Sequence, residues 1–308
     1  MSKLVPEKFG SLSRLLDMQL SLFPQHERFL SSRFADVDED HLAFTDKIAE
    51  LVTRIAGSSL DVICEDYRWL AHIVFEEEIF FRRHGRYRLS KFTDAVEQVY
   101  SNAPYMHRYM NGLLATQIWW RNHTDVLRVF SDAYLPGNRP GFSHLEIGPG
   151  HGLFLHLAAS SPLCAQAEGW DISVSSIDAT RAALSCMGTP SDVSLQLCDL
   201  FEEHDRSFDS IVCSEVLEHL EQPADALARM RRLLAPGGRV FVNAPVNSPA
   251  PDHIYLFKTP EALVEMVRDA DFDILTTHLA PATGATLERA RAKMLTISTV
   301  VVASLPQN

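Results

Sequence analysis

The stretch that decides the fold is His144-Leu145-Glu146-Ile147-Gly148-Pro149-Gly150-His151-Gly152. Apolar Leu145 and Ile147 flank an acid, three glycines follow at every second position, and residues 153–159 form a helix-favouring run. Glycine permits the positive φ angles of a tight loop and lets a ligand approach bare backbone. The helix start behind it supplies unpaired N–H groups. The stretch therefore predicts a strand, a glycine loop and a helix, in that order.

A second carboxylate, Asp171, ends the next apolar stretch. In a doubly wound sheet an acid at this strand end accepts hydrogen bonds from two ribose hydroxyls. The spacing Glu-x-Gly-x-Gly-x-Gly followed by this acid resembles motif I of class I S-adenosylmethionine (SAM)-dependent methyltransferases. In that family the glycine loop packs under the methionine part of SAM. The resemblance implies that SAM is bound by Glu146, Gly148, Gly150, Gly152, Asp171 and Ile172.

Two further motifs follow predicted strands and extend the resemblance. After residues 193–197 comes Asp199-Leu200, where the family often has an acid that accepts the adenine amino group and an apolar neighbour on the ring. The alternative for Asp199 is a helix N-cap. After residues 208–213 comes Ser214-Glu215-Val216-Leu217-Glu218-His219-Leu220, which is similar to a stretch common in small-molecule methyltransferases of the ubiquinone type. The resemblance places Ser214 and Glu215 against SAM.

From residue 143 onward, short apolar runs alternate with helical ones, which is typical of a parallel α/β sheet. We expect a Rossmann-like SAM-binding domain over residues 143–308. The predicted strands are 144–147, 167–170, 193–197, 208–213, 239–244, 272–278 and 296–303. The predicted helices in this half include 221–234, 260–269 and 286–294. Ligands of such sheets bind at the carboxyl ends of the strands, where all the motifs lie.

Residues 1–135 show helical spacing and predict an all-helical cap that binds the acceptor. Helices are expected up to Gly57 and over 60–83, 91–100 and 105–130, with a linker over 131–142 that contains Pro136, Gly137, Pro140 and Gly141. Aromatic side chains near the glycine loop could line the acceptor pocket, although core packing is the commoner role at helical spacing. That reading favours the core for Trp120 and Tyr134. The predicted acceptor-binding residues in the cap are Tyr105, Trp119, Arg121 and Asn122.

The segment after the fifth strand, residues 243–257, contains three prolines and predicts a stiff loop at the mouth of the sheet. His253 is the first candidate for acceptor contact and Tyr255 the second, with Asn247 as a further acceptor ligand. A loop anchored by its own hydrogen bonds is the alternative. His219 is a candidate acid or base, whereas Glu218 is expected to orient a neighbouring loop. His151 is expected to contact SAM or the cap.

Composition restricts the partners. The net charge of −12 argues against nucleic acid, whose phosphates favour basic surfaces. No apolar run has the length of a membrane span, and residues 1–10 do not form a signal peptide. Five scattered cysteines without a Cys-x-x-Cys pair predict reduced thiols, no metal site and a cytoplasmic protein. We expect it to be a homo-oligomer, most simply a dimer.

The predicted chemistry is methyl transfer from SAM to a small molecule, an in-line displacement in which alignment and exclusion of water matter most. A hydroxyl acceptor must lose a proton and needs a base, whereas a thioether needs none. The cap and the Pro-rich loop also resemble bacterial methionine S-methyltransferases of dimethylsulfoniopropionate synthesis. Methionine sulfur is therefore the first hypothesis for the acceptor, and a phenol or carboxylic acid oxygen the second. A non-catalytic SAM-binding protein is the third.

Overall fold

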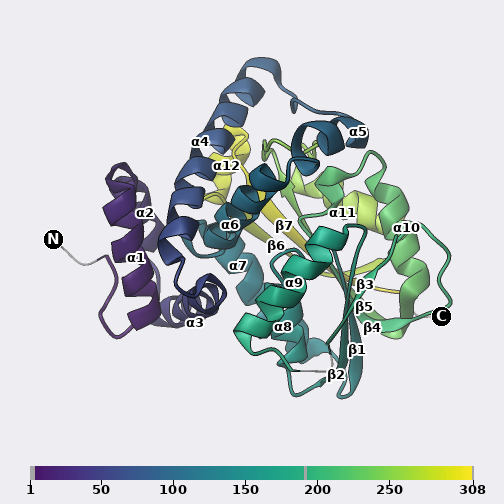
Figure 1. Cartoon of the computed structure of the whole chain (residues 1–308). Coiled ribbons are helices and arrows are strands. Elements are labelled where there is room, and N and C mark those ends of the chain that lie inside the picture. Colours follow the sequence, from purple (N-terminus) through teal and green to yellow (C-terminus); the bar gives the residue numbers. More distant parts are fainter. Residues whose placement is uncertain (1–3, 191–192, 307–308) are drawn as a thin grey trace.

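The computed structural model describes residues 4–190 and 193–306 and contains a seven-stranded sheet in the order β3-β2-β1-β4-β5-β7-β6 (Figure 1). Strand β7 pairs antiparallel with both of its neighbours, and β1 to β5 are mutually parallel. The strands are β1 Phe142–Ile147, β2 Cys164–Asp171, β3 Val193–Leu197, β4 Phe208–Ser214, β5 Leu234–Val246, β6 Asp273–Pro281 and β7 Ile297–Ser304. All seven predicted strands are present, and the Rossmann-like α/β fold is confirmed.

The connections of this half are α8 Leu153–Ala159, α9 Val174–Met187, the 3₁₀ turn η5 Leu217–His219, α10 Pro223–Leu233, α11 Pro260–Asp269 and α12 Leu287–Lys293. Side chains cap three of these helices, which fixes where each begins. Ser173 accepts from the N–H of Ser176, Thr259 from that of Ala262, and Thr286 from that of Arg289.

Because β1 to β5 are parallel, their carboxyl ends lie at one edge of the sheet, and the loops that follow them meet there.

The N-terminal half is helical, as expected. Its elements are α1 Gly10–Leu22, η1 Pro24–His26, α2 Glu27–Phe34, α3 Glu39–Ala56, α4 Leu60–His84, α5 Phe92–Ala95, η2 Val96–Tyr100, α6 Ala103–Trp119, α7 Arg121–Val129, η3 Phe130–Tyr134 and η4 Leu135–Gly137. The prediction of one helix over 105–130 was wrong, because the chain is extended at Trp120. The indole N–H of Trp120 donates to the hydroxyl of Tyr67 at 3.3 Å, and α7 starts in a new direction.

The hydrophobic core runs across the predicted boundary between the two halves. One cluster of buried residues includes Leu12 and Trp119 of the helices together with Phe154 and Phe241 of the sheet region. The predicted linker is helical up to Gly137 and forms part of this core. The hydroxyl of Tyr134 lies 2.9 Å from both Ser210 Oγ and the Arg239 carbonyl oxygen, so the segment is fastened to β4 and β5. Tyr134 is thus a core residue, as expected.

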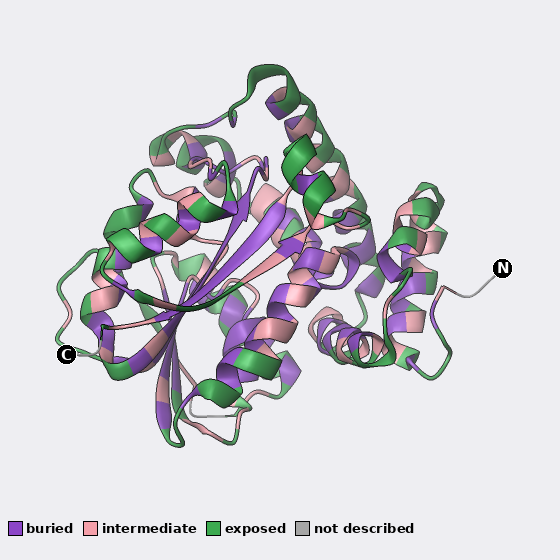
Figure 2. Ribbon diagram, turned by 180° about the vertical axis from the view of Figure 1, so that it is seen from behind, coloured by how far each residue is buried: buried purple, intermediate pink, exposed green. Residues whose placement is uncertain are grey.

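Burial follows this arrangement: the central strands β1, β4, β5 and β7 are mostly buried, whereas β3 and β6 at the two edges of the sheet and the outer faces of the helices are more exposed (Figure 2). The longest helix, α4, has charged residues through much of its sequence and ends with Arg82, Arg83 and His84. In the part of the chain that the structure describes, no helix combines the length and apolar character of a membrane crossing.

The buried histidine of β1 makes stability depend on pH. His144 is fully buried, and burial lowers its pKa from 6.5 to about 3. Below pH 6.5 the imidazole of His144 is protonated in the unfolded chain but not in the folded chain. The contribution of this group to the free energy of unfolding is therefore fully present above pH 6.5 and falls on acidification, by up to about 1.4 kcal/mol per pH unit. We expect urea unfolding to show a smaller loss between pH 7 and pH 5 in His144→Gln than in the wild type. Equal losses in both proteins would contradict this assignment.

Candidate active site

The glycine loop between β1 and α8 has the backbone that its sequence predicts. Gly148, Gly150 and Gly152 have φ angles of 65°, 50° and 74°, which side chains disfavour. A Cβ on Gly148 would lie 2.9 Å from Val216 Cγ2, whereas one on Gly150 would lie 3.6 Å from Met110 Cε of α6. Val216 therefore lies against the loop at Gly148, and Met110 of α6 passes over it at Gly150.

The end of β2 presents a carboxylate beside an exposed apolar side chain. Asp171 accepts hydrogen bonds from Ser173 N at 2.8 Å and from Ser176 Oγ at 2.7 Å. Each carboxylate oxygen has a further lone pair for a ligand hydroxyl. The side chain of Ile172 is 60% exposed, which is unusual for isoleucine and leaves an apolar surface next to the acid.

The end of β3 differs from the prediction in one residue. Asp199 accepts a hydrogen bond from Phe201 N at 2.9 Å, which agrees with its alternative role as a turn cap and leaves its second oxygen available. Leu200 was predicted to pack on a ligand ring, but its side chain is buried in the core below the sheet. Phe201, whose ring is 39% exposed, is the apolar side chain that faces solvent here.

Three polar residues line the ends of β1, β4 and β5. Glu146 is buried, one of its carboxylate oxygens lacks a hydrogen-bond partner among the described residues, and burial raises its pKa well above the usual range. Glu215 has a φ of 55°, and burial raises its pKa to about 7. Asn243 Nδ2 donates to Ser214 Oγ at 3.0 Å and to Glu215 Oε1 at 2.8 Å, so this strand end is held rigidly.

These residues fit SAM. The bare glycine loop accepts a close ligand, Asp171 offers acceptors to a diol, and Ile172 offers an apolar face. The unpartnered oxygen of Glu146 leaves a buried acceptor beneath the loop. An uncompensated buried carboxylate is costly, so a donor or a cationic group near it is favourable.

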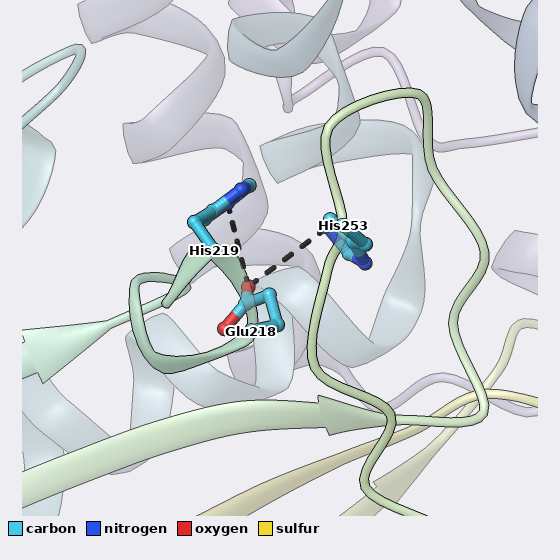
Figure 3. A group of neighbouring side chains, drawn as sticks. All are labelled: Glu218, His219 and His253. Atoms are coloured by element: carbon cyan, nitrogen blue, oxygen red, sulfur yellow. Dashed lines mark ion pairs between the residues drawn. The ribbon is translucent and has the colours of Figure 1, made fainter. Parts of the chain in front are cut away.

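A second group lies where β4 and β5 end, formed by Glu218, His219 and His253 (Figure 3). The loop that carries His253 is tied to η5, since Ile254 N and Tyr255 N both donate to the Glu218 carbonyl oxygen at 2.8 and 2.9 Å. Glu218 therefore orients a neighbouring loop through its backbone, as expected. Its carboxylate takes no part in holding this loop, since both oxygens are buried and neither has a hydrogen-bond partner among the described residues.

Tyrosines of the helical half close over this group. The hydroxyls of Tyr109 and Tyr100 donate to the two carboxylate oxygens of Asp252 at 2.7 and 3.4 Å. The Tyr87 hydroxyl accepts from Ser248 N at 3.0 Å, and its ring meets that of His253 edge to face at 5.7 Å. Tyr87 and Tyr100 were not identified from the sequence, which gives no sign that α4–α6 would reach residues 248–253.

Several predicted acceptor-binding residues are used for packing instead. Trp119 is fully buried among the helices, and its indole N–H donates to Gln19 Oε1 at 3.1 Å. Asn122 Nδ2 donates to Ser298 Oγ at 2.9 Å, and Asn247 Nδ2 donates to the Lys258 carbonyl oxygen at 3.1 Å. The indole N–H of Trp119 is thereby used, and each amide gives one of its N–H groups to a protein oxygen. The anchored-loop alternative therefore describes Asn247 better than acceptor binding does.

The other three candidates differ in position. Tyr105 is stacked on Tyr109, and burial together with the charge of Asp252 raises its pKa to about 12. Arg121 begins α7, with its guanidinium 3.8 Å from Asp125. Tyr255 packs its ring on Phe257 at 4.8 Å, at the border of the core below the sheet.

Comparison with known proteins agrees with the glycine-loop site. Residues 145–240 match the family model described as a methyltransferase domain. This match lies within the sheet half, whose α/β fold and strand-end motifs resemble those of class I SAM-dependent methyltransferases. The chain is 34% identical over 101 residues to the ubiquinone biosynthesis O-methyltransferase of Paracidovorax citrulli (strain AAC00-1), which is 32% of this chain and 41% of the relative. The chain is 28% identical over 131 residues to the ubiquinone biosynthesis O-methyltransferase of Neisseria meningitidis serogroup A / serotype 4A (strain DSM 15465 / Z2491). This match covers 42% of this chain and 54% of the relative.

The methyltransferase domain thus matches about half of the length of these curated relatives. Solved structures with a similar fold extend further along the chain. The mitomycin 7-O-methyltransferase MmcR has a TM-score of 0.54 at 12% identity and covers 81% of this chain and 71% of its own. An O-methyltransferase family protein from Burkholderia thailandensis has a TM-score of 0.54 at 14% identity, and the match covers 80% of this chain and 72% of that protein. Because the sheet half is little more than half of the chain, both likenesses include part of the helical half.

Proposed function

We propose that this protein transfers the methyl group of SAM to an oxygen atom of a small-molecule acceptor. The observation that carries the proposal is the placement of two histidines, His219 and His253, at the ends of β4 and β5, beside the strand ends that fit SAM. Burial lowers the pKa of His253 to about 4, so its imidazole is neutral at physiological pH. A neutral imidazole can accept or relay the proton that a hydroxyl acceptor must lose.

The chain's own residues account for the remaining requirements. SAM, when bound, supplies an electrophilic methyl group on a sulfonium. Gly148, Gly150, Asp171 and Ile172 bind and orient it, and α6 covers the glycine loop through Met110. The same helix, α6, also reaches the second group, since the Tyr109 hydroxyl donates to Asp252 Oδ1 at 2.7 Å. The helical half therefore encloses the space between donor and acceptor and excludes water.

The position of the two histidines favours acceptors that must lose a proton over acceptors that have none to lose. A thioether such as that of methionine has no proton to lose, so its methylation does not require the histidine pair as a base. A phenol, an alcohol or a carboxylic acid loses a proton on methylation, and the histidine pair can accept it. The curated relatives carry O-methyltransferase in their names, which supports an oxygen acceptor. We therefore rank oxygen before sulfur, reversing the order that the sequence suggested, and a non-catalytic role third.

An acceptor screen tests the proposal. The protein is incubated with isotopically methyl-labelled SAM and, separately, catechols, simple phenols, aliphatic diols, carboxylic acids and methionine, and products are identified by mass spectrometry. We expect label in an O-methyl group from at least one oxygen acceptor and none in methionine. The Asp171→Ala variant is the matched control, since a true product requires the SAM site. Formation of S-methylmethionine with all oxygen acceptors inert would overturn the proposal.

A further inference from the structure

The second group has the arrangement of an ion site. Glu218 Oε1 lies 3.8 Å from His219 Nε2 and 4.0 Å from His253 Nε2, with the carboxylate between the two imidazoles (Figure 3). All three ligand atoms lie within 4.8 Å of one another. These separations are too long for hydrogen bonds. Ligands of a tetrahedral ion, each about 2.1 Å from it, lie about 3.4 Å apart. Side-chain movements of up to about 1 Å therefore bring all three onto a common centre.

Hydrogen bonds fix both imidazoles in the tautomer that a metal requires. His253 Nδ1 lies 2.6 Å from the Ser248 carbonyl oxygen, and His219 Nδ1 lies 3.1 Å from the Asp252 carbonyl oxygen. A carbonyl oxygen only accepts, so each Nδ1 carries the proton and donates it. Each Nε2 then has a free lone pair. Metal-binding histidines show this arrangement, because the hydrogen bond at one nitrogen orients the ring and raises the basicity of the other.

The carboxylate of Glu218 needs a partner that the described residues do not provide. Its side chain is fully buried, and neither oxygen accepts a hydrogen bond from any described residue. The carboxylate of Glu215 lies near enough to raise the pKa of Glu218 further. Buried carboxylates are normally paired or bound to a metal. A divalent cation would compensate both charges, whereas the neutral imidazole of His253 would compensate neither.

We propose that Glu218, His219 and His253 bind a divalent transition-metal ion, with Mn²⁺ and Zn²⁺ as the best-suited ions. Two imidazole nitrogens and one carboxylate favour such an ion over Mg²⁺ or Ca²⁺, which prefer oxygen ligands. Three protein ligands leave coordination positions open for a ligand. The cysteines of the sequence gave no indication of this site, since none of them contributes to it.

The consequence for chemistry rests on the proposed function. An acceptor with two neighbouring oxygens, such as a catechol or a vicinal diol, would fill two of the open positions. Because the imidazole lone pairs then hold the ion, the ion would take the place of an imidazole base: it would lower the pKa of the bound hydroxyl, whose proton would leave to water. The oxygen then forms a bond to the methyl carbon while the carbon–sulfur bond breaks, and the electron pair of that bond stays on sulfur. The substrate class that follows is a small molecule with adjacent hydroxyl groups.

The test measures metal binding by the full chain without SAM or acceptor. Protein treated with EDTA and exchanged into metal-free buffer is titrated with Mn²⁺, Zn²⁺ and Mg²⁺ by calorimetry, and Mn²⁺ binding is followed by electron paramagnetic resonance. We expect one Mn²⁺ or Zn²⁺ per chain and weaker binding of Mg²⁺. Glu218→Gln, which preserves size, and His253→Ala should each weaken the affinity by at least about 100-fold. Absence of one-to-one binding of any of the three ions by the wild type would overturn the proposal, whatever the variants do.

The matched control is His72→Ala. His72 Nε2 lies 3.4 Å from Glu76 Oε1 on the surface of α4, so this exposed histidine–glutamate pair reports adventitious binding. We expect its loss to leave the affinity unchanged, and loss of binding in His72→Ala but not in Glu218→Gln would refute the site. Methyl transfer is measured separately. Metal binding without any O-methyl product would reject the proposed function alone, whereas undiminished turnover by metal-free protein would reject the role of the ion in catalysis.

Discussion

Replacing Asp171 by alanine is expected to weaken SAM binding at least about 100-fold, since two charge-assisted hydrogen bonds are lost at about 1.5–3 kcal/mol each. Asp171 ends β2 beside the open glycine loop, and both of its oxygens retain lone pairs toward the ligand side. The measurement is calorimetric titration with SAM and with S-adenosylhomocysteine. The fold is checked by thermal unfolding, because Asp171 also accepts hydrogen bonds from Ser173 N and Ser176 Oγ at the start of α9.

Ser176→Ala is the matched control for these hydrogen bonds at the helix start. It removes the hydroxyl that donates to Asp171 Oδ2 at 2.7 Å but leaves the carboxylate in place. We expect SAM affinity within a few-fold of the wild type. If Ser176→Ala lost as much affinity as Asp171→Ala, the effect would come from the helix start rather than from the ligand. Unchanged affinity in Asp171→Ala would refute the ribose assignment itself.

The donor side of the site could be predicted from the sequence because its determinants are local. A positive φ at Gly148 and Gly150 and an acid at the end of β2 depend on neighbours within a few residues. Strand order then brings the separate motifs to one edge of the sheet, since parallel strands share the direction of their carboxyl ends. Leu200 is more deeply buried than Phe201, which alternation along a short turn does not show.

The acceptor side could not be predicted in the same way, because its determinants are distant in sequence. Trp119 is a core residue since Gln19, a hundred positions earlier, accepts from its indole. The helix break at Trp120 has no glycine or proline to announce it. It depends on the hydrogen bond to Tyr67 and on the one that Arg121 N donates to Thr283 Oγ1 at 2.8 Å. Tertiary contacts override helix propensity at such positions.

Glu218 shows the difference most clearly. Its neighbours in sequence suggest a residue that orients a loop, and its carbonyl oxygen does this for residues 254 and 255. Whether its carboxylate has a partner depends on the conformation of the loop after β5, which the Tyr87 hydroxyl holds through Ser248 N. The sequence contains every one of these residues but not the burial that makes the carboxylate of Glu218 costly without a cation. The site is therefore a property of the packed helical half together with the sheet.

His253→Ala is expected to lower kcat for O-methyl transfer by about 10²-fold or more while SAM affinity stays within a few-fold of the wild type. The imidazole is neutral at pH 7 because burial lowers its pKa to about 4, and its Nε2 points toward Glu218. Both roles available to it, accepting a proton and binding an ion, use this lone pair. Neither involves SAM, which is why the loss should fall on turnover. The measurement is steady-state kinetics with the acceptor identified by the screen, together with calorimetry for SAM.

Tyr87→Phe separates loss of the imidazole from displacement of its loop. It removes the hydroxyl that accepts from Ser248 N at 3.0 Å but keeps the ring that meets His253 edge to face. We expect a loss of turnover below about 10-fold, since the Nδ1 hydrogen bond of His253 to the Ser248 carbonyl oxygen remains. A greater loss in Tyr87→Phe than in His253→Ala would mean that the loop, not the imidazole, is what the reaction requires. Turnover of His253→Ala within twofold of the wild type would remove His253 from the reaction, because a group whose lone pair accepts the proton or holds the ion cannot be deleted at so small a cost.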